Sequence, residues 1–168
     1  ACVLGQRYID SLSGALFELL RDDPSVCIIG EDILDPYGGA FKVTRGLSAA
    51  FPDRILTTPI SEAGIVGIAG GMALRGLRPI VEIMFGDFLT LSTDQIVNHL
   101  AKFRAMYNGQ ATCPVVIRTP MGGGRGYGPT HSQSLEKMYL GVPHLTRLAP
   151  SHFHDAGRIL KRAVMLSE

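Results

Sequence analysis

Short apolar runs alternate along this chain with segments of helical hydrophobic spacing. The runs predict strands at 25–30, 54–58, 78–85, 114–120 and 145–150. The segments between them predict helices at 4–23, 45–51, 61–76, 92–107, 134–141 and from 152 to the end. Continuous apolar strands separated by helices indicate a parallel sheet that is covered on both faces. With right-handed crossovers, the sequence predicts an α/β fold with a doubly wound, mainly parallel sheet and helices on both faces.

Polar segments follow four of the predicted strands. They read "GED" at 30–32, "TPISE" at 58–62, "MFGDF" at 84–88 and "TPMGGGRGYGPTHSQ" at 119–133. In open parallel sheets, ligands bind beyond the carboxyl ends of the strands. We therefore expect these segments to gather at one edge of the sheet and to form the functional site.

Length, charge and cysteine content narrow the class of protein. A chain of 168 residues fits a single domain with a substantial core. The net charge of +1 gives no electrostatic reason to expect nucleic acid or a membrane surface as partner, and the most apolar stretch, 63–85, contains three charged residues. Three widely spaced cysteines and no signal-peptide pattern favour a reducing, cytoplasmic setting.

Glu62 stands at the start of the predicted helix 61–76, which also contains glycines at 64, 67, 70 and 71. Each glycine inside a helix costs about 1 kcal/mol relative to alanine, so a packing or binding need should explain them. One interpretation is structural: Ser61 caps the helix, Glu62 interacts favourably with its dipole, and the glycines let a neighbouring element approach. The other is that closely packed backbone holds Glu62 rigidly as a functional carboxylate.

Two further acids are candidates for different roles. Glu31 follows the strand 25–30 and is expected near Glu62, where paired carboxylates in a partly desolvated cleft would separate in pKa. The alternative is that Glu31 is an exposed loop acid. Glu82 and Arg118 lie inside successive predicted strands, and because a buried charge needs a partner, we expect them to form an ion pair.

The aromatic residues and the glycine-rich loop offer binding and acid–base groups. Phe88 could stack on a flat heteroaromatic ligand, whereas Phe85 is equally consistent with core packing. The loop at 119–133 lacks the GK[ST] of a P-loop, and the chain has no dinucleotide-binding fingerprint. A mobile loop that presents His131 for acid–base chemistry fits better, although a loop histidine is often only polar surface. No spacing typical of metal ligands stands out.

At these residues the sequence resembles the pyrimidine-binding domain of thiamine diphosphate enzymes, specifically the beta subunit of the decarboxylating component of 2-oxo acid dehydrogenases. The resemblance rests on "GED" with "GGAFKVTRGL", "RILTTPISEAGIVGIAGGMALRGLRPIVEIMFGDF", "DQIVNHLAK", "PVVIRTPMGGG" and "HSQSLE". These stretches occur in family order with family-like spacing over nearly the whole chain. The resemblance implies oxidative decarboxylation of a 2-oxo acid, such as pyruvate or a branched-chain 2-oxo acid, and acyl transfer to a lipoyl group.

The resemblance also implies roles for individual residues. Glu62 would hydrogen-bond a ring nitrogen of the cofactor's aminopyrimidine and switch its tautomer, and Glu31 would relay protons near the cofactor. Phe88 would stack on the pyrimidine, and the backbone at Ile60 would line the same pocket. His131 would lie near the reacting carbon and assist acyl transfer.

Other implications concern groups outside this chain. The resemblance implies that magnesium and the diphosphate are held by an alpha subunit, because this sequence lacks the family's Gly-Asp-Gly segment. It also implies beta–beta pairing in a heterotetramer and a lipoyl acyltransferase as a further partner. We expect residues 1–168 to form one pyrimidine-binding domain without the family's C-terminal domain. Leu166 stands where some members carry an acid near a monovalent cation.

Two alternatives remain open at this point. The same domain type occurs in transketolase and deoxyxylulose phosphate synthase, so ketol transfer is the first alternative, although "HSQ" and the glycine-rich loop favour the dehydrogenases. The second is that the isolated chain is an inactive assembly module.

Overall fold

The computed structural model describes residues 7–166. The α-helices are α1 (Tyr8–Asp22), α2 (Leu47–Ala50), α3 (Glu62–Leu74), α4 (Phe103–Met106) and α5 (Ala156–Met165). The strands are β1 (Val26–Gly30), β2 (Ile55–Thr57), β3 (Arg78–Glu82) and β4 (Val116–Arg118). Short helical segments of other kinds are η1 (Pro52–Arg54), η2 (Gly86–Ser92), η3 (Gln95–Leu100) and η4 (Glu136–Tyr139).

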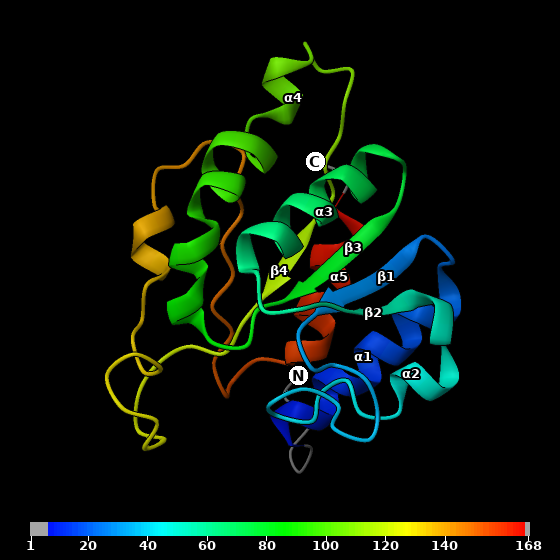
Figure 1. Ribbon diagram of the computed structural model, residues 1–168, viewed down its shortest axis with the longest axis vertical. Coiled ribbons are helices and arrows are strands. Elements are labelled where there is room, and N and C mark those ends of the chain that lie inside the picture. Colours follow the sequence, from blue (N-terminus) through cyan, green and yellow to red (C-terminus); the bar gives the residue numbers. More distant parts are fainter. Residues whose placement is uncertain (1–6, 167–168) are drawn as a thin grey trace.

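The strands form one parallel sheet in the order β2-β1-β3-β4 (Figure 1). Strand β1 lies inside the sheet, with Ile28 opposite Ile55 of β2 on one side and Ile80 of β3 on the other. All strands of this sheet run in the same direction, so their carboxyl ends meet at one edge. The predicted fold class is therefore confirmed.

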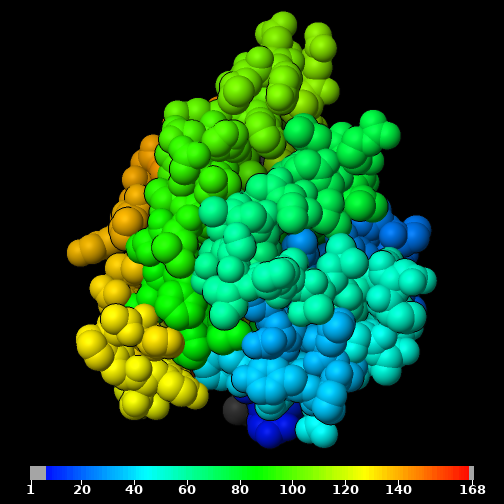
Figure 2. All heavy atoms as spheres, viewed as in Figure 1, coloured from blue at the N-terminus to red at the C-terminus, as the bar shows by residue number. Residues whose placement is uncertain are grey.

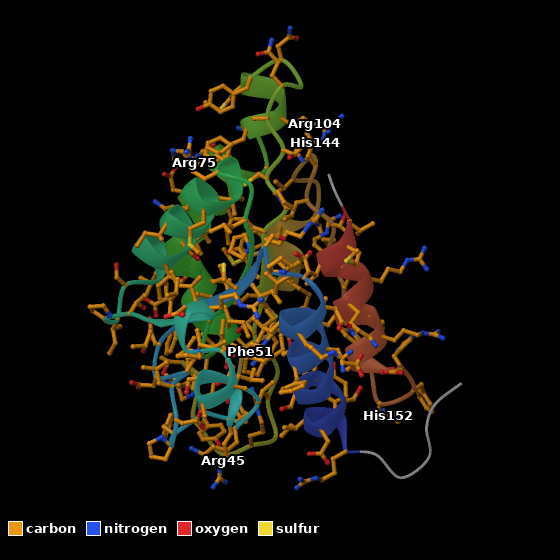
Figure 3. All side chains as sticks on the ribbon, turned by 90° about the vertical axis from the view of Figure 1, so that its right-hand side faces the viewer. Arg45, Phe51, Arg75, Arg104, His144 and His152 are labelled. Carbon is orange, nitrogen blue, oxygen red and sulfur yellow. The ribbon has the colours of Figure 1, made fainter. Side chains whose placement is uncertain are left out.

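Helices cover both faces of the sheet, as alternating strand residues require. Val26, Ile28 and Ile80 point into a core shared with α1 and α5, whereas Ile29 and Val81 point into a core shared with α3, η2 and η3. In the edge-on view of Figure 3, α3 lies on one side of the sheet and α1 and α5 lie together on the other. The predicted helices 4–23, 61–76 and 152 to the end correspond to α1, α3 and α5.

The predicted helix 92–107 is wrong as a continuous element. In its place lie the end of η2, the π-helical turn η3 and the short α4. The side chains of Ser92 and Thr93 both donate to the carbonyl of Leu89, and such local bonds compete with regular helical bonding. The segment is therefore divided into short stretches with different helical bonding, including the wider π-type bonds of η3.

The predicted strand 145–150 is also wrong, because these residues join no strand in the part of the chain that the structure describes. Leu145 packs in the core on the α3 side, and Arg147 donates to the carbonyl of Tyr139 at 2.8 Å. The predicted helix 134–141 shrinks to η4. Strand β3 ends at Glu82, three residues earlier than predicted.

Helix α5 lies unusually close to α1 around Gly157. Its amide donates to the Ser11 hydroxyl at 2.9 Å, and that hydroxyl donates to Asp155, which also caps α5 by accepting from the Arg158 amide. A Cβ at position 157 would overlap the Ser11 carbonyl oxygen. The two helices can therefore dock in this arrangement only if residue 157 is glycine.

We expect Gly157→Ala to lower the free energy of unfolding by about 1–3 kcal/mol, because the added methyl forces α5 away from α1. The matched control is Gly14→Ala in α1, where a Cβ meets nothing within 4 Å. That control should gain up to about 1 kcal/mol from better helix propensity. Urea unfolding of both variants measures the difference, and equal effects at the two positions would contradict the close docking.

Candidate functional site

The sheet has a topological switch point between β1 and β3. After β1 the chain moves to β2 on one side, and from β2 it crosses to β3 on the other side. Loops leaving β1 and β3 therefore diverge, and the crevice between them is where open α/β sheets bind ligands. The carboxylates of Glu31 and Glu62 lie at this edge, directly after β1 and at the first residue of α3.

Glu31 and Glu62 are both buried, with 7% and 5% of their surfaces exposed. Burial raises the pKa of Glu31, and the nearby Glu62 carboxylate raises it further, while the Ser61 backbone amide acts in the opposite direction as a hydrogen-bond donor. The Glu31 Oε1 atom is buried without a hydrogen-bond partner. The side chain of Glu62 likewise makes no hydrogen bond to another residue in the described part of the chain. The pair thus offers oxygen atoms that are free to bind a ligand.

The segment between β2 and α3 holds these acids in place. The Thr58 amide donates to the Gly30 carbonyl at 3.0 Å, which ties the segment to the end of β1. Ser61 occupies the N-cap position of α3, but its side chain makes no capping hydrogen bond, so this part of the structural interpretation is wrong. Ile60 is 82% exposed, which leaves its backbone open to a bound molecule or a partner chain.

The expected ion pair between Glu82 and Arg118 is confirmed. The two residues are neighbours in the register of β3 and β4, and the Arg118 guanidinium donates to the Glu82 carboxylate. Both side chains are largely buried, so the pair neutralises charge within the sheet edge. Glu82 is therefore already engaged, whereas neither Glu31 nor Glu62 forms an ion pair with a cation among residues 7–166.

An aromatic cluster lies at the end of β3. The His131 ring makes edge-to-face contacts with Phe85 and Phe88, with ring centroids 4.7 and 5.1 Å apart. Phe85 is buried and also contacts Phe41 and Tyr127, which confirms its core-like role. Phe88 is only half-buried, so part of its surface is available for stacking. The structure thus brings His131 and Phe88 together, as it brings Glu31 and Glu62 together.

Two features of this cluster were missed by the sequence analysis. Arg125 inserts its guanidinium among Phe41, Phe85 and Tyr127, at 5.4 to 6.0 Å from the ring centres. Asp87 is 7% exposed and accepts hydrogen bonds from Gln133. The segment "FGDF" and the loop containing "RGY" are both visible in the sequence, but no sequence signal indicates that they contact each other.

The donor set suits a flat, nitrogen-containing ring better than a metal ion. Unpartnered carboxylate oxygens can hydrogen-bond ring nitrogens, and the half-buried Phe88 offers an aromatic face. Within residues 7–166, no group of three or more His, Cys, Asp or Glu side chains could hold a metal ion. Over the same residues, no helix has the length and apolar character needed to cross a membrane.

These features define a doubly wound α/β ligand-binding domain with a buried acidic pair at its switch point. The family described as "Transketolase, pyrimidine binding domain" matches residues 6–168. The chain belongs to this family, which confirms the resemblance at the level of the domain.

Named relatives are components of 2-oxo acid and acetoin enzymes. The chain is 43% identical to pyruvate dehydrogenase E1 component subunit beta-3, chloroplastic, of Oryza sativa, over 92% of this chain and 40% of the relative. It is 40% identical to 2-oxoisovalerate dehydrogenase subunit beta of Bacillus subtilis, over 94% of this chain and 48% of the relative. It is 41% identical to the beta subunit of acetoin:2,6-dichlorophenolindophenol oxidoreductase of Cupriavidus necator, over 92% and 48%. The chain thus spans less than half of each of these relatives.

A solved structure, a split gene transketolase described as an inactive beta4 tetramer, has the same fold. Its TM-score is 0.73, and the likeness covers 95% of this chain and 48% of that chain at 22% sequence identity. The shared architecture supports the fold assignment independently of the sequence match.

We expect Glu31→Gln to stabilise the chain at neutral pH. Because the pKa of Glu31 is raised in the folded state, the folded state binds this proton more tightly than the unfolded chain. Its contribution to stability is therefore present below the unfolded pKa and is lost as pH rises through the folded pKa. We measure the free energy of unfolding in urea from pH 4 to pH 8. At pH 7 this free energy should be larger for the variant than for the parent, and the difference should shrink towards pH 4. A variant that is less stable than the parent at pH 7 would contradict the assignment.

Proposed function

We propose that this chain is the pyrimidine-binding half of a thiamine diphosphate-dependent 2-oxo acid dehydrogenase component and acts together with an alpha-type partner chain. The observation that carries the proposal is the buried pair Glu31 and Glu62, with the Glu31 Oε1 atom lacking a hydrogen-bond partner, at the switch point of a domain of this family. The 40–43% identity to beta subunits of pyruvate and 2-oxoisovalerate dehydrogenases supports the same reaction class.

Glu62 is the group that would hydrogen-bond a ring nitrogen of the aminopyrimidine. When bound, the cofactor supplies the carbon nucleophile and the electron sink for decarboxylation of a 2-oxo acid. The role of Glu62 is to share a proton with the ring, in a setting where burial strengthens that hydrogen bond. Glu31 has a raised pKa and can hold or return a proton beside it.

The other predicted site residues would bind and orient the cofactor and substrate. Phe88 would stack its open face on the pyrimidine, and the exposed backbone at Ile60 would line the pocket. His131, packed on Phe85 and Phe88, would act as acid or base near the reacting carbon and assist acyl transfer to a lipoyl arm.

The outward face of α3 supports the need for a partner chain. Gly64, Gly67, Ile68 and Gly71 are exposed on it, with Ile68 at 54%. In the space-filling view of Figure 2, the atoms of this segment lie uncovered at the front of the molecule. Nearly bare backbone permits close approach of another chain, and the adjacent Ile60 extends the apolar surface. We propose that an alpha-type chain, which would hold magnesium and the diphosphate, docks here.

Further partners and location follow from the same proposal. Beta–beta association and a lipoyl acyltransferase belong to the assembly that we propose for the complete enzyme. A cytoplasmic location stays a prediction, since rice relatives are named chloroplastic or mitochondrial.

The first test is calorimetric titration of thiamine diphosphate and magnesium into the chain, alone and mixed with its alpha-type partner. We expect tight binding only in the mixture and at least tenfold weaker binding with Glu62→Gln, since a buried, charge-assisted hydrogen bond is worth about 1.5–3 kcal/mol. Glu136→Gln, at an exposed glutamate, is the matched control. Unchanged binding by Glu62→Gln would rule out the proposed role of Glu62. Turnover of sugar phosphates but not of pyruvate or branched-chain 2-oxo acids would instead favour ketol transfer.

A second test addresses the partner surface. A Cβ at Gly71 meets nothing within 4 Å, so Gly71→Leu should leave the chain alone folded and should strengthen α3. The same side chain should obstruct close docking and weaken association with the alpha-type chain, as measured by sedimentation velocity. Gly14→Leu, on α1 at the other face of the sheet, should leave association unchanged. Equal association of the two variants would place the partner elsewhere.

A further inference from the structure

The glycine-rich loop is closed at its neck, residues 120–122 and 133, where its two ends meet. The Gly86 amide donates to the Pro120 carbonyl at 2.9 Å, and the Gly122 amide donates to the Gln133 carbonyl at 3.1 Å. Met121 packs so tightly on Gly86 that a Cβ there would overlap its side chain. Residues 122–133 therefore form a compact loop whose ends are joined, as in an Ω-loop.

Asp87 adds a buried carboxylate to this neck, on the Gln133 side. Its Oδ1 atom accepts from the Gln133 side-chain amide at 2.8 Å and from the Gln133 backbone amide at 3.3 Å. The carboxylate is 7% exposed and has no ion pair with any described residue. A buried acid without a cation depends on such hydrogen bonds, so the contact with Gln133 offsets the desolvation of Asp87.

The neck lies only two residues from His131, and Asp87 lies between Phe85 and Phe88. The same short segment thus supplies both the rings against which His131 packs and the carboxylate that fixes the loop carrying it. The N-terminal end of the loop is held by a different contact, because the Arg125 guanidinium donates to the Gly122 carbonyl at 2.8 Å. Releasing Gln133 from Asp87 would free the chain on the His131 side of the loop.

We propose that Asp87, through Gln133, is a positioning residue that holds the imidazole of His131 against Phe85 and Phe88 at the reaction edge. Asp87 itself takes no part in proton transfer. The placement of the ring follows from the contacts of this chain alone, and only its consequence for turnover rests on the proposed function.

The test uses NMR of the histidine ring protons, which requires neither cofactor nor partner. Contacts with two aromatic rings should displace the His131 resonances from those of exposed histidines, and His131→Gln assigns them by their loss. Gln133→Ala removes one hydrogen bond without touching the core, and Gln133→Glu places two carboxylates together. We expect both variants to move the His131 resonances towards those of exposed histidines, with the larger change in Gln133→Glu. Exchange of the Gly122 amide should become roughly tenfold faster.

A reciprocal double variant tests the specific contact. In Asp87→Asn combined with Gln133→Glu, the asparagine amide can donate to the glutamate, so the His131 resonances should return towards those of the parent. Gln110→Ala and Asp53→Asn, at exposed positions, are the matched controls and should change nothing. Unchanged His131 resonances in Gln133→Glu, or no recovery in the double variant, would overturn the proposal.

Kinetics of the assembled enzyme then link positioning to function. We expect Gln133→Glu to lower kcat about tenfold or more while the affinity for thiamine diphosphate stays within about twofold, because the acidic pair is not altered. A fall in kcat without any change in the His131 resonances would contradict positioning through the loop. Failure of the parent to bind the cofactor would overturn the proposed function and leave the NMR result standing.

Discussion

The position of β1 between β2 and β3 is the constraint on which the site depends. Because both neighbours are parallel to β1, every connection must return to the opposite end of the sheet before the next strand begins. For this reason, no tight hairpin turn joins two neighbouring strands at the carboxyl edge of the sheet. The loops there can carry polar groups, and they diverge at the switch point. The acidic pair and the aromatic cluster both lie in loops at this carboxyl edge.

Burial without compensation distinguishes the acidic pair from the other charged groups nearby. Glu82 has Arg118, and Asp87 has Gln133, so each is satisfied within the chain. Glu31 has neither a cation nor a side-chain donor of this kind: burial and the nearby Glu62 carboxylate raise its pKa, and its Oε1 atom has no hydrogen-bond partner. Burying these carboxylates lowers the free energy of unfolding of the chain. Proteins commonly retain such a cost at sites that bind a ligand.

Sequence patterns predicted the parts of the fold that depend on local order and on strand burial. The runs around β1 and β3 are apolar enough to identify buried parallel strands, and the order of elements then brings Glu31 close to Glu62. The prediction failed where side chains replace regular backbone bonding, as at Ser92 and Thr93, or where an extended run such as 145–150 has no neighbour to pair with. The contact between Asp87 and Gln133 spans 46 residues and has no periodic signal, so only the folded structure reveals it.

The outward face of α3 has a consequence for how its surface can change over time. Where side chains form a contact, a substitution can enlarge, shrink or recharge it, and a partner can adjust in small steps. At Gly64, Gly67 and Gly71 there is no side chain to reduce, so every substitution at these three positions adds bulk to the surface. Substitution at these positions can therefore only increase the side-chain volume on this face. A chain that docks here must either make room for the added side chain or lose the contact.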